Sequence, residues 1–441
     1  MPAPDSLAGE LSQVVREAQA EHRLPSVSAA AVRDGEVVWE ETIGLADAEG
    51  GEPATANHQY RIASITKTVT AVGVLQLRDE GRLDLDDPLT RHVPEAKHDP
   101  TIRGLLTHLS GIQREVPGEV WETLEMPTRE QLLPRLAEAE QVLPPAAYWH
   151  YSNLAFALLG EVVARVSGGS AEDYLDERVL RPLGMTRTSW TPRPPVATGY
   201  LVDPYSDTLR REAIVEGRAV APAAELWSTP GDLCRWAAFI AKPDPAVLAP
   251  ATLDEMRAFQ SMVDLTRWRL GYGLGFALYR VEDDVFVGHD GAHAGFLAHV
   301  SAHPAKRTGA AVLTNAGAGV TFSALGLRLS KAVADAHRPV VEEWRPGERP
   351  PRELEQVLGR WWTEGHELVF SFRNGKLESL FPDARLDLGR SVYEREGDDR
   401  YRVVDGYERG ELLRIVRDDS GTPVKLYLAT YPVTREPQTF G

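Results

Sequence analysis

Residues 60–81 have the sequence YRIASITKTVTAVGVLQLRDEG, and this stretch decides the fold. Apolar residues recur at helical spacing over 65–80, and Gly81 supplies the expected C-terminal stop, so the pattern predicts a helix. Ser64 and Lys67 stand three positions apart at its start, which places hydroxyl and amine on one helix face. The positive end of the helix dipole stabilises negative charge at the same point. Taken alone, S-x-x-K favours an ordinary helix start with a Ser cap and a surface lysine.

Two further polar stretches lie at predicted element boundaries. The run YWHYSN at 148–153 contains Tyr151 and Asn153 and precedes an apolar helix predicted from Leu154. The run GHDGAHAG at 288–295 lies between two predicted strands, where glycines allow a ligand to approach the backbone closely. Each has a plain alternative, namely a helix cap under a packed ring for the first and a Gly-rich turn for the second.

Together and in this order, the three motifs resemble those of the serine β-lactamase and penicillin-binding-protein superfamily, whose patterns are S-x-x-K, S-D-N and K-T-G. The Y-x-N sequence at 151–153 is similar to that of the class C-like branch. Further segments agree with this branch, namely LLTHLSGI at 105–112, PLGM at 182–185, LWSTPGDL at 226–233 and VLTN at 312–315. The resemblance implies an α/β (α+β) fold, with an antiparallel sheet flanked by helices and an all-helical insertion.

The resemblance also implies the roles of the site residues. Ser64 would be the nucleophile, Lys67 and Tyr151 the proton-transfer pair, Asn153 the holder of a substrate amide and His289 an electrostatic aid to Tyr151, with the backbone N–H groups of Ser64 and Ala292 forming the oxyanion hole. Free lysine and tyrosine have pKa values of about 10.4 and about 10, so we expect burial and mutual proximity to lower both. A histidine would add a charge that switches near neutral pH.

The third motif departs from the family pattern, because His289 and Asp290 replace the more usual Lys and Thr or Ser. Branch members with His here are commonly esterases, D-amino-acid peptidases or peptide cyclases, so the fold alone does not predict β-lactamase activity. We predict substrate contacts for Trp227, Asp290, Gly291 and Phe296. The rings of Trp149, Trp227 and Phe296 would keep water from the ester, and Trp227→Ala would then raise hydrolysed relative to cyclic product. Core packing is the alternative for these rings.

The order of strand and helix patterns predicts the domains. A hairpin around Asp34-Gly35, a helical middle at about 85–260 and strands after Gly271 indicate one sheet with a helical insertion, so residues 1–338 are predicted to form the catalytic domain. Residues 339–352 are rich in Pro, Arg and Glu and are predicted to be a linker. Alternating segments and turn pairs over 353–441 predict a small antiparallel β-barrel, which resembles the lipocalin-like domain of some relatives.

Charge and composition exclude several classes of function. The formal net charge of −17 disfavours nucleic acid and anionic membrane surfaces as partners. No stretch approaches 18 uninterrupted apolar residues, and the first residues lack the pattern of a secretory signal, so we expect a cytoplasmic protein. The single cysteine, Cys234, is expected to be a buried apolar side chain. No metal or other cofactor is expected, because no acidic or Cys residue completes a set with His289 and His293.

The most specific resemblance is to penicillin-binding-protein-type thioesterases, which cyclise nonribosomal peptides. It implies a peptidyl thioester substrate with a D-residue at its acyl end, either free or bound to a carrier protein, and head-to-tail macrolactam formation. Arg435 would then bind the incoming terminus of the substrate, with a surface or strand-edge charge as its alternative. Two other interpretations stay open, namely a cytosolic D-amino-acid peptidase, amidase or esterase that uses water as acceptor, and an inactive binding or sensor protein.

Overall fold

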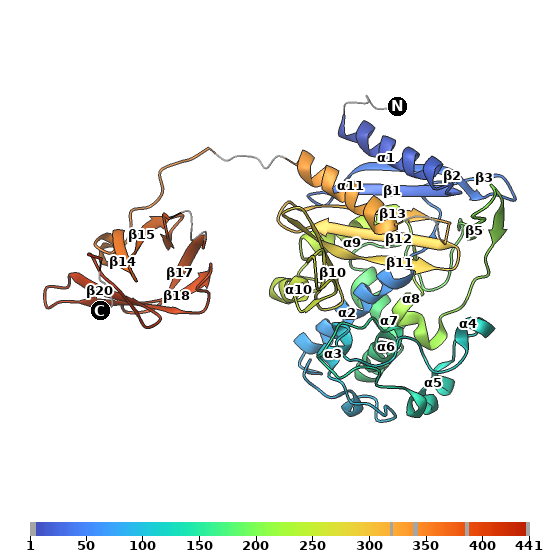
Figure 1. Cartoon of the computed structure of the whole chain (residues 1–441), viewed down its shortest axis with the longest axis horizontal. Helices are drawn as coiled ribbons and strands as arrows, with labels where there is room; N and C mark the ends of the chain where they lie inside the picture. Colours follow the sequence, from blue (N-terminus) through green and yellow to red (C-terminus); the bar gives the residue numbers. More distant parts are fainter. Residues whose placement is uncertain (1–5, 318–320, 338–342, 384–387, 438–441) are drawn as a thin grey trace. The chain divides into compact units, whose positions relative to one another are not determined.

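The computed structural model describes residues 6–317, 321–337, 343–383 and 388–437 (Figure 1). The chain forms two compact units, residues 1–339 and 340–441. Of the predicted linker, positions 339–342 lie outside the described residues, and so do positions 438–441 of the predicted β domain.

The first unit is built on a nine-stranded antiparallel sheet in which the two ends of the unit meet. Its order is β3-β2-β1-β13-β12-β11-β10-β9-β8, so an N-terminal hairpin pairs with the last strand of the unit. The strands are β1 (Ser26–Arg33), β2 (Glu36–Asp47), β3 (Glu52–Pro53), β8 (Ser261–Met262), β9 (Leu270–Tyr272), β10 (Ala277–Val281), β11 (Asp284–His293), β12 (Phe296–His303) and β13 (Thr308–Thr314). The predicted hairpin turn is present, since Asp34 and Gly35 have φ of +53° and +92°. Small sheets pair β4 (Tyr60–Arg61) with β7 (Trp227–Ser228) and β5 (Tyr200–Val202) with β6 (Leu209–Arg211).

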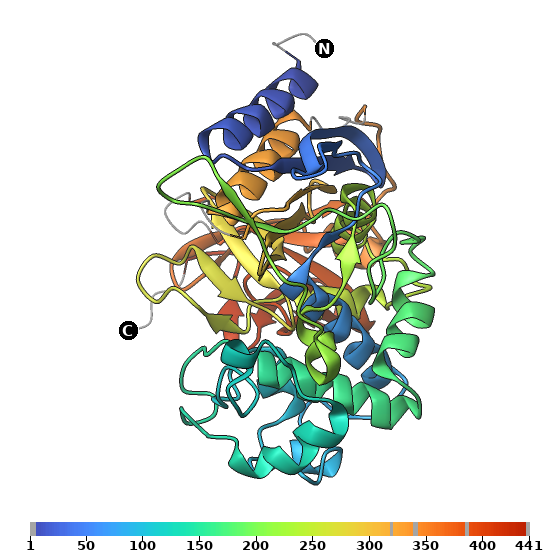
Figure 2. The same ribbon diagram turned by 90° about the vertical axis from the view of Figure 1, so that its right-hand side faces the viewer.

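Helices cover both faces of the main sheet, and β1 shows why both faces must be buried. Ala29 and Ala31 pack into a cluster with α1 (Leu7–Glu21) and α11 (Phe322–Ala336), which lie side by side in Figure 2. Ala30 and Val32 point the other way and join the larger core with α9 (Pro230–Ala241). Successive side chains of a strand alternate between faces, so this apolar run is buried on both sides.

The region between β4 and β8 is mainly helical, as predicted. Its helices are α2 (Thr66–Asp79), α3 (Ile102–Leu106), α4 (Val120–Thr123), α5 (Arg129–Arg135), α6 (Asn153–Ser167), α7 (Ala171–Leu175), α8 (Ala221–Ala224), α9 and α10 (Pro250–Arg257), with short 3-10 or π turns at Ala63–Ile65, Leu89–Arg91, Leu136–Glu138, Asp176–Leu180 and Arg218–Val220. The expected fold class, a sheet flanked by helices with a helical insertion, is confirmed.

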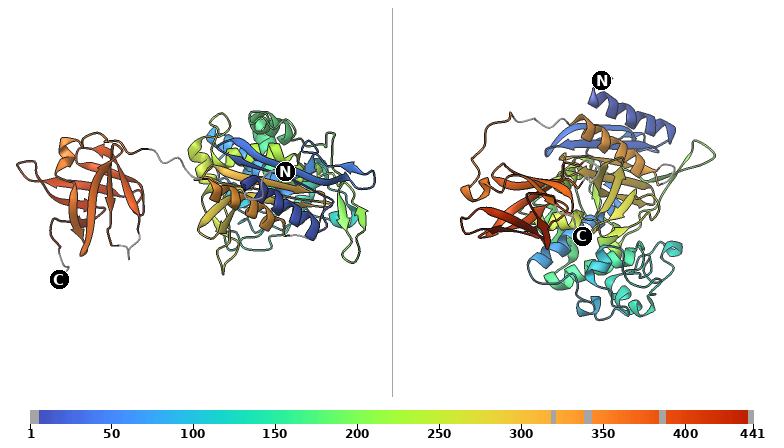
Figure 3. Two further views of the ribbon diagram at one scale, coloured as in Figure 1. Left: turned by 90° about the horizontal axis from the view of Figure 1, so that it is seen from above. Right: turned by 60° about the vertical axis from the view of Figure 1, so that its left-hand side comes forward.

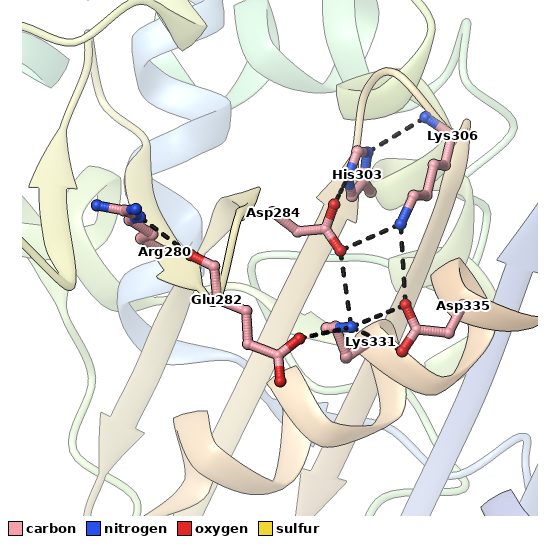
Figure 4. A network of polar contacts seen from close by, with 7 residues as sticks. All are labelled: Arg280, Glu282, Asp284, His303, Lys306, Lys331 and Asp335. Carbon is pink, nitrogen blue, oxygen red and sulfur yellow. Dashed lines mark hydrogen bonds and ion pairs between the residues drawn. The ribbon is translucent and has the colours of Figure 1, made fainter. Parts of the chain in front are cut away.

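A surface network of charged side chains joins two hairpins of the sheet to α11 (Figure 4). Lys331 on α11 contacts Asp335 at 2.7 Å, Glu282 at 3.2 Å and Asp284 at 3.8 Å. Asp284 in turn contacts His303 at 2.9 Å. Because several charges share partners, the network fixes the position of α11 on the sheet better than an isolated surface pair would.

The second unit is a nearly closed barrel of eight antiparallel strands, which Figure 3 shows in two orientations. In chain order they are β14 (Gly359–Thr363), β15 (His366–Arg373), β16 (Lys376–Leu380), β17 (Arg390–Gly397), β18 (Arg400–Asp405), β19 (Leu412–Arg417), β20 (Pro423–Leu428) and β21 (Tyr431–Val433), preceded by α12 (Arg352–Glu355). Two backbone hydrogen bonds, of 2.8 and 2.9 Å, join Trp362 of β14 to Thr434, the residue directly after β21. Asn374 and Gly375 form the turn between β15 and β16 with positive φ, as their sequence predicts.

Candidate active site

Ser64 lies on a tight turn that exposes it from an otherwise buried segment. The 3-10 turn Ala63–Ile65 connects β4 to α2, and β4 is held by pairing of Arg61 with Trp227. From His58 to Leu77, Ser64 is the only residue that is not buried. Ala63 has a φ of +45°, an uncommon conformation for a residue with a side chain. The surrounding core therefore holds the backbone in a bend that presents the Ser64 hydroxyl at the surface.

Lys67 is fully buried, and its amine is aimed at Ser64 by two other contacts. Its Nζ lies 3.1 Å from Ser64 Oγ, 2.8 Å from Asn153 Oδ1 and 2.8 Å from the Ala223 carbonyl oxygen. Burial lowers the pKa of Lys67 well below its usual range. The negative charge of Glu115 acts to raise this pKa, but burial has the larger effect. A neutral amine has two N–H donors and one lone pair. When the two carbonyl oxygens accept the donors, the lone pair faces the hydroxyl, so the geometry suits Lys67 as a general base.

Tyr151 and Asn153 reach the same place from the start of α6, where Ser152 caps the helix by accepting from Ala155 N at 3.0 Å. The Tyr151 phenol interacts with the Ser64 side chain, and Lys67 Nζ lies 4.8 Å from the centroid of the Tyr151 ring. Burial raises the pKa of Tyr151 above its usual value, so the expectation of a lowered pKa is wrong. Desolvation outweighs the neighbouring charges, and a phenol that keeps its proton suits the role of proton donor.

Asn153 is engaged at both ends of its amide. Its Oδ1 accepts from Lys67, and its Nδ2 donates to Glu115 Oε1 at 2.8 Å. These contacts position Lys67 and leave one amide hydrogen for a substrate, so the predicted substrate contact stays a prediction.

His289 is buried on the sheet side of the site and is neutral. Its pKa is lowered to about 4 by burial and by the charge of Lys67, so the expected switch of charge near neutral pH is wrong. Its Nδ1 lies 2.5 Å from the Asp290 carbonyl oxygen and its Nε2 lies 3.1 Å from Tyr272 Oη. A proton on Nδ1 satisfies the carbonyl and leaves Nε2 to accept from Tyr272. The centroids of the His289 and Tyr151 rings are 6.4 Å apart.

The strand that carries the third motif lies against the nucleophile turn. β10 pairs with β11 only as far as Gly288, so the rest of β11 has no partner from β10. A Cβ on Gly291 would lie 2.1 Å from the Ile62 carbonyl oxygen, which only glycine permits. This close approach brings the backbone of Ala292 near Ser64, as an oxyanion hole made from their N–H groups requires. The oxyanion role itself remains a prediction.

Three residues that are predicted to contact the substrate contact other protein side chains in the structure. Trp227 has no exposed surface, and its ring packs edge-on against Phe296, which is also buried, with centroids 5.2 Å apart. Both rings belong to the core, so Trp227 and Phe296 do not line the site. The Asp290 carboxylate binds Tyr279 Oη at 2.8 Å and His299 Nδ1 at 2.7 Å. Its side chain therefore leaves β11 on the face opposite to His289 and Gly291.

Arg435 is bound within its own unit. Its guanidinium lies 3.9 Å from the centroid of the Trp361 ring and donates to the carbonyl oxygens of Arg360, at 2.8 Å, and Gln356. These contacts account for the side chain structurally, and a role in substrate binding stays a prediction.

The structure adds residues to the site that the sequence motifs did not indicate. His108 is fully buried, and its Nδ1 accepts from Ser152 N at 3.1 Å, while its ring centroid lies 4.4 Å from that of Tyr151 and 5.0 Å from that of Tyr272. Glu115 holds Asn153, as described above. His108 belongs to the family-like segment LLTHLSGI, which was a usable signal, whereas Tyr272 and Glu115 have no pattern of their own in the sequence.

Within the residues that the structure describes, no group of three or more His, Cys, Asp or Glu side chains could hold a metal ion. No single described helix is long and apolar enough to span a membrane, although the bent pair Asn153–Ser167 and Ala171–Leu180 would be by length and composition.

Known proteins match both units. A family model described as Beta-lactamase matches residues 11–334, and one described as a domain of unknown function (DUF7586) matches residues 350–435.

Beta-lactamase-like protein 2 of Dictyostelium discoideum is 31% identical over 262 residues, which cover 56% of this chain and 48% of that protein. The D-alanyl-D-alanine-carboxypeptidase/endopeptidase AmpH of Escherichia coli K12 is 30% identical over 282 residues, which cover 57% of this chain and 70% of AmpH. The crystal structure of SurE superposes with a TM-score of 0.64 at 25% identity, covering 98% of this chain and 100% of SurE. The chain thus spans about half the length of its Dictyostelium relative, and it belongs to the beta-lactamase family.

Proposed function

We propose that Ser64 takes the acyl group of a peptidyl thioester ending in a D-residue and passes it to the peptide's own amine, which closes a macrolactam. The observation that carries acyl transfer is the Lys67 amine, 3.1 Å from Ser64 Oγ and depressed in pKa by burial. The assignment of macrolactam formation is supported by the resemblance of the motifs to peptide-cyclising thioesterases and by the C-terminal barrel. The match to SurE extends over both units of the chain.

In the first half-reaction, the Ser64 oxygen attacks the thioester carbon while its proton passes to the Lys67 lone pair. The carbonyl oxygen becomes an oxyanion that accepts from the N–H groups of Ser64 and Ala292, a stabilisation typically worth about 3 kcal/mol for each donor. The carbon–sulfur bond then breaks, and the thiol leaves with a proton relayed from Lys67 through the Tyr151 phenol. The product is an ester on Ser64 and a free thiol.

In the second half-reaction, the free amine of the bound peptide attacks the ester carbon. The amine loses a proton to neutral Lys67, the bond between the ester carbon and Ser64 Oγ breaks as that oxygen takes up a proton, and the new amide bond closes the ring. Water at about 55 M competes for the same ester, so the tethered amine must reach a higher effective concentration than this. The buried rings of His108 and Tyr272 beside Tyr151 limit the water that this part of the site can hold.

The proposal is tested with a synthetic peptidyl N-acetylcysteamine thioester that ends in a D-residue and carries a free N-terminal amine. We expect mass spectrometry to show loss of the thiol and formation of a cyclic product lacking one water relative to the linear acid. The epimer with a terminal L-residue is the matched control and should react at least about tenfold more slowly. Linear acid as the sole product from the D-substrate would overturn cyclisation.

The second candidate is a peptidase, amidase or esterase that acts on D-residues and uses water. This hypothesis is favoured by the similarity to AmpH, which is named for its action on D-alanyl-D-alanine bonds. Hydrolysis of D-aminoacyl amides and short acyl esters, without cyclic product, would establish it. A protein that only binds ligands would show no mass shift at Ser64 with a fluorophosphonate.

A further inference from the structure

Residues 113–115 run alongside the second motif and are bonded to it at every position. The Gln113 carbonyl oxygen accepts from Ser152 Oγ at 2.7 Å, and the Arg114 carbonyl oxygen accepts from Asn153 N at 2.7 Å. The Glu115 carboxylate accepts from Asn153 Nδ2 at 2.8 Å. The short segment is therefore held rigidly against the residues that position Lys67.

One functional group of this segment remains open to solvent, the guanidinium of Arg114. Its side chain is 61% exposed, and its Cζ lies 4.9 Å from the centroid of the Tyr151 ring. Within the described residues its acidic neighbour is Glu115, whose Oε1 lies 3.5 Å from Arg114 Nε and also accepts from Asn153 Nδ2. A guanidinium has five N–H donors in a planar fork, so this one keeps donors available for a ligand beside Tyr151.

We propose that Arg114 determines specificity by binding a carboxylate of the substrate peptide. The anchored backbone and the stacking on Tyr151 fix the direction of the guanidinium, which lowers the entropy lost when a ligand binds. A planar guanidinium matches a carboxylate through two parallel hydrogen bonds. This inference rests on the proposed function. In a thioester the reacting carbonyl is bonded to sulfur and is not a free carboxylate. The carboxylate that Arg114 binds therefore belongs to the peptide acyl chain.

The test uses two thioesters that differ only by a D-Glu or a D-Gln residue next to the reacting D-residue. Acylation is followed as release of the thiol, and the quantity compared is the ratio of kcat/KM for the carboxylate and the carboxamide substrate. We expect the protein to prefer the carboxylate by about three- to tenfold, the size of a partly exposed charge-assisted contact. The ratio should fall to about 1 in Arg114→Ala, invert in Arg114→Glu and be partly retained in Arg114→Lys.

The ratio separates recognition from electrostatic effects of Arg114 on Lys67 and Tyr151, because those act on both substrates equally. Arg181→Ala, which removes an exposed arginine elsewhere in the helical region, is the matched control and should keep the ratio of the unaltered protein. A preference that survives in Arg114→Ala would overturn the proposal, as would equal loss of rate for both substrates without a change in ratio. Thiol release does not depend on the acceptor, so the outcome is independent of whether the ester ends as a ring or as a linear acid.

Discussion

Gly160 on α6 packs directly against Pro222 on α8, so closely that a Cβ on Gly160 would lie 2.2 Å from Pro222 Cγ. The next residue along α8, Ala223, supplies the carbonyl oxygen that accepts from Lys67 Nζ. The contact between the two helices therefore sets the position of one of the two acceptors that aim the catalytic amine.

We expect Gly160→Ala to displace α8 and to lower the acylation rate by about tenfold or more, since misplacing a catalytic group by a fraction of an ångström is costly. Alanine is the better helix former by about 1 kcal/mol, which offsets part of the lost stability. Gly169→Ala is the control, because a Cβ there meets nothing within 4 Å. Unchanged thiol release by Gly160→Ala would show that α8 does not position Lys67.

The pH dependence of acylation should have one rising limb that belongs to Lys67. Protonated lysine cannot accept the Ser64 proton, so activity is absent at low pH and appears as pH rises through the depressed pKa, well below the usual value near 10.5. His289, with a pKa of about 4, is already neutral above pH 5 and should add no inflection between pH 5 and 8. A profile of kcat/KM for thiol release checks this. If the unaltered protein showed a second inflection near pH 6.5 and His289→Asn removed it, the prediction would be wrong.

Replacing Tyr151 by Phe should slow reactions in proportion to how much the leaving group needs a proton. The phenol keeps its proton because burial raises its pKa, so it serves as the donor to the departing group. We expect a loss of about 10²- to 10⁴-fold with amide or alkyl thioester substrates. With a thiophenyl ester, whose thiolate leaves unaided, the loss should be much smaller. An equal loss with all leaving groups would assign Tyr151 to another step.

Removing the Arg435 guanidinium should destabilise the barrel. It lies over the Trp361 ring and satisfies backbone carbonyls, contacts worth about 1 kcal/mol for a partly exposed side chain. Hydrogen exchange at residues 356–361 of the full chain should be faster in Arg435→Ala, and Arg409→Ala is the control. If Arg435 also binds the incoming terminus of the substrate, Arg435→Ala will change the ratio of cyclic to hydrolysed product, while Ser64 is still acylated at its usual rate.

Trp227→Ala is now expected to act through stability. Its ring is fully buried against Phe296, and removing a buried Trp typically costs about 3–5 kcal/mol. A lower midpoint of unfolding with an unchanged product ratio would confirm a packing role, whereas a raised share of hydrolysed product in folded protein would restore the role in shielding the ester.

The sequence by itself determined the features that depend on neighbouring residues. Ser64 and Lys67 share a helix face because they are three positions apart, and turn pairs such as Asp34-Gly35 and Asn374-Gly375 place hairpins because their residues tolerate positive φ. The resemblance of the motifs extended this local information to the fold class, which the structure confirms.

Only the tertiary structure decided the protonation of the site and the surroundings of its aromatic residues. The pKa of Tyr151 moves up and that of His289 moves down because both are desolvated, and burial depends on segments far apart in the sequence. The same holds for Trp227, whose apolar ring is equally compatible with a pocket or a core until its neighbours are known. Long-range packing sets the dielectric environment of each side chain, and no local pattern of residues records it.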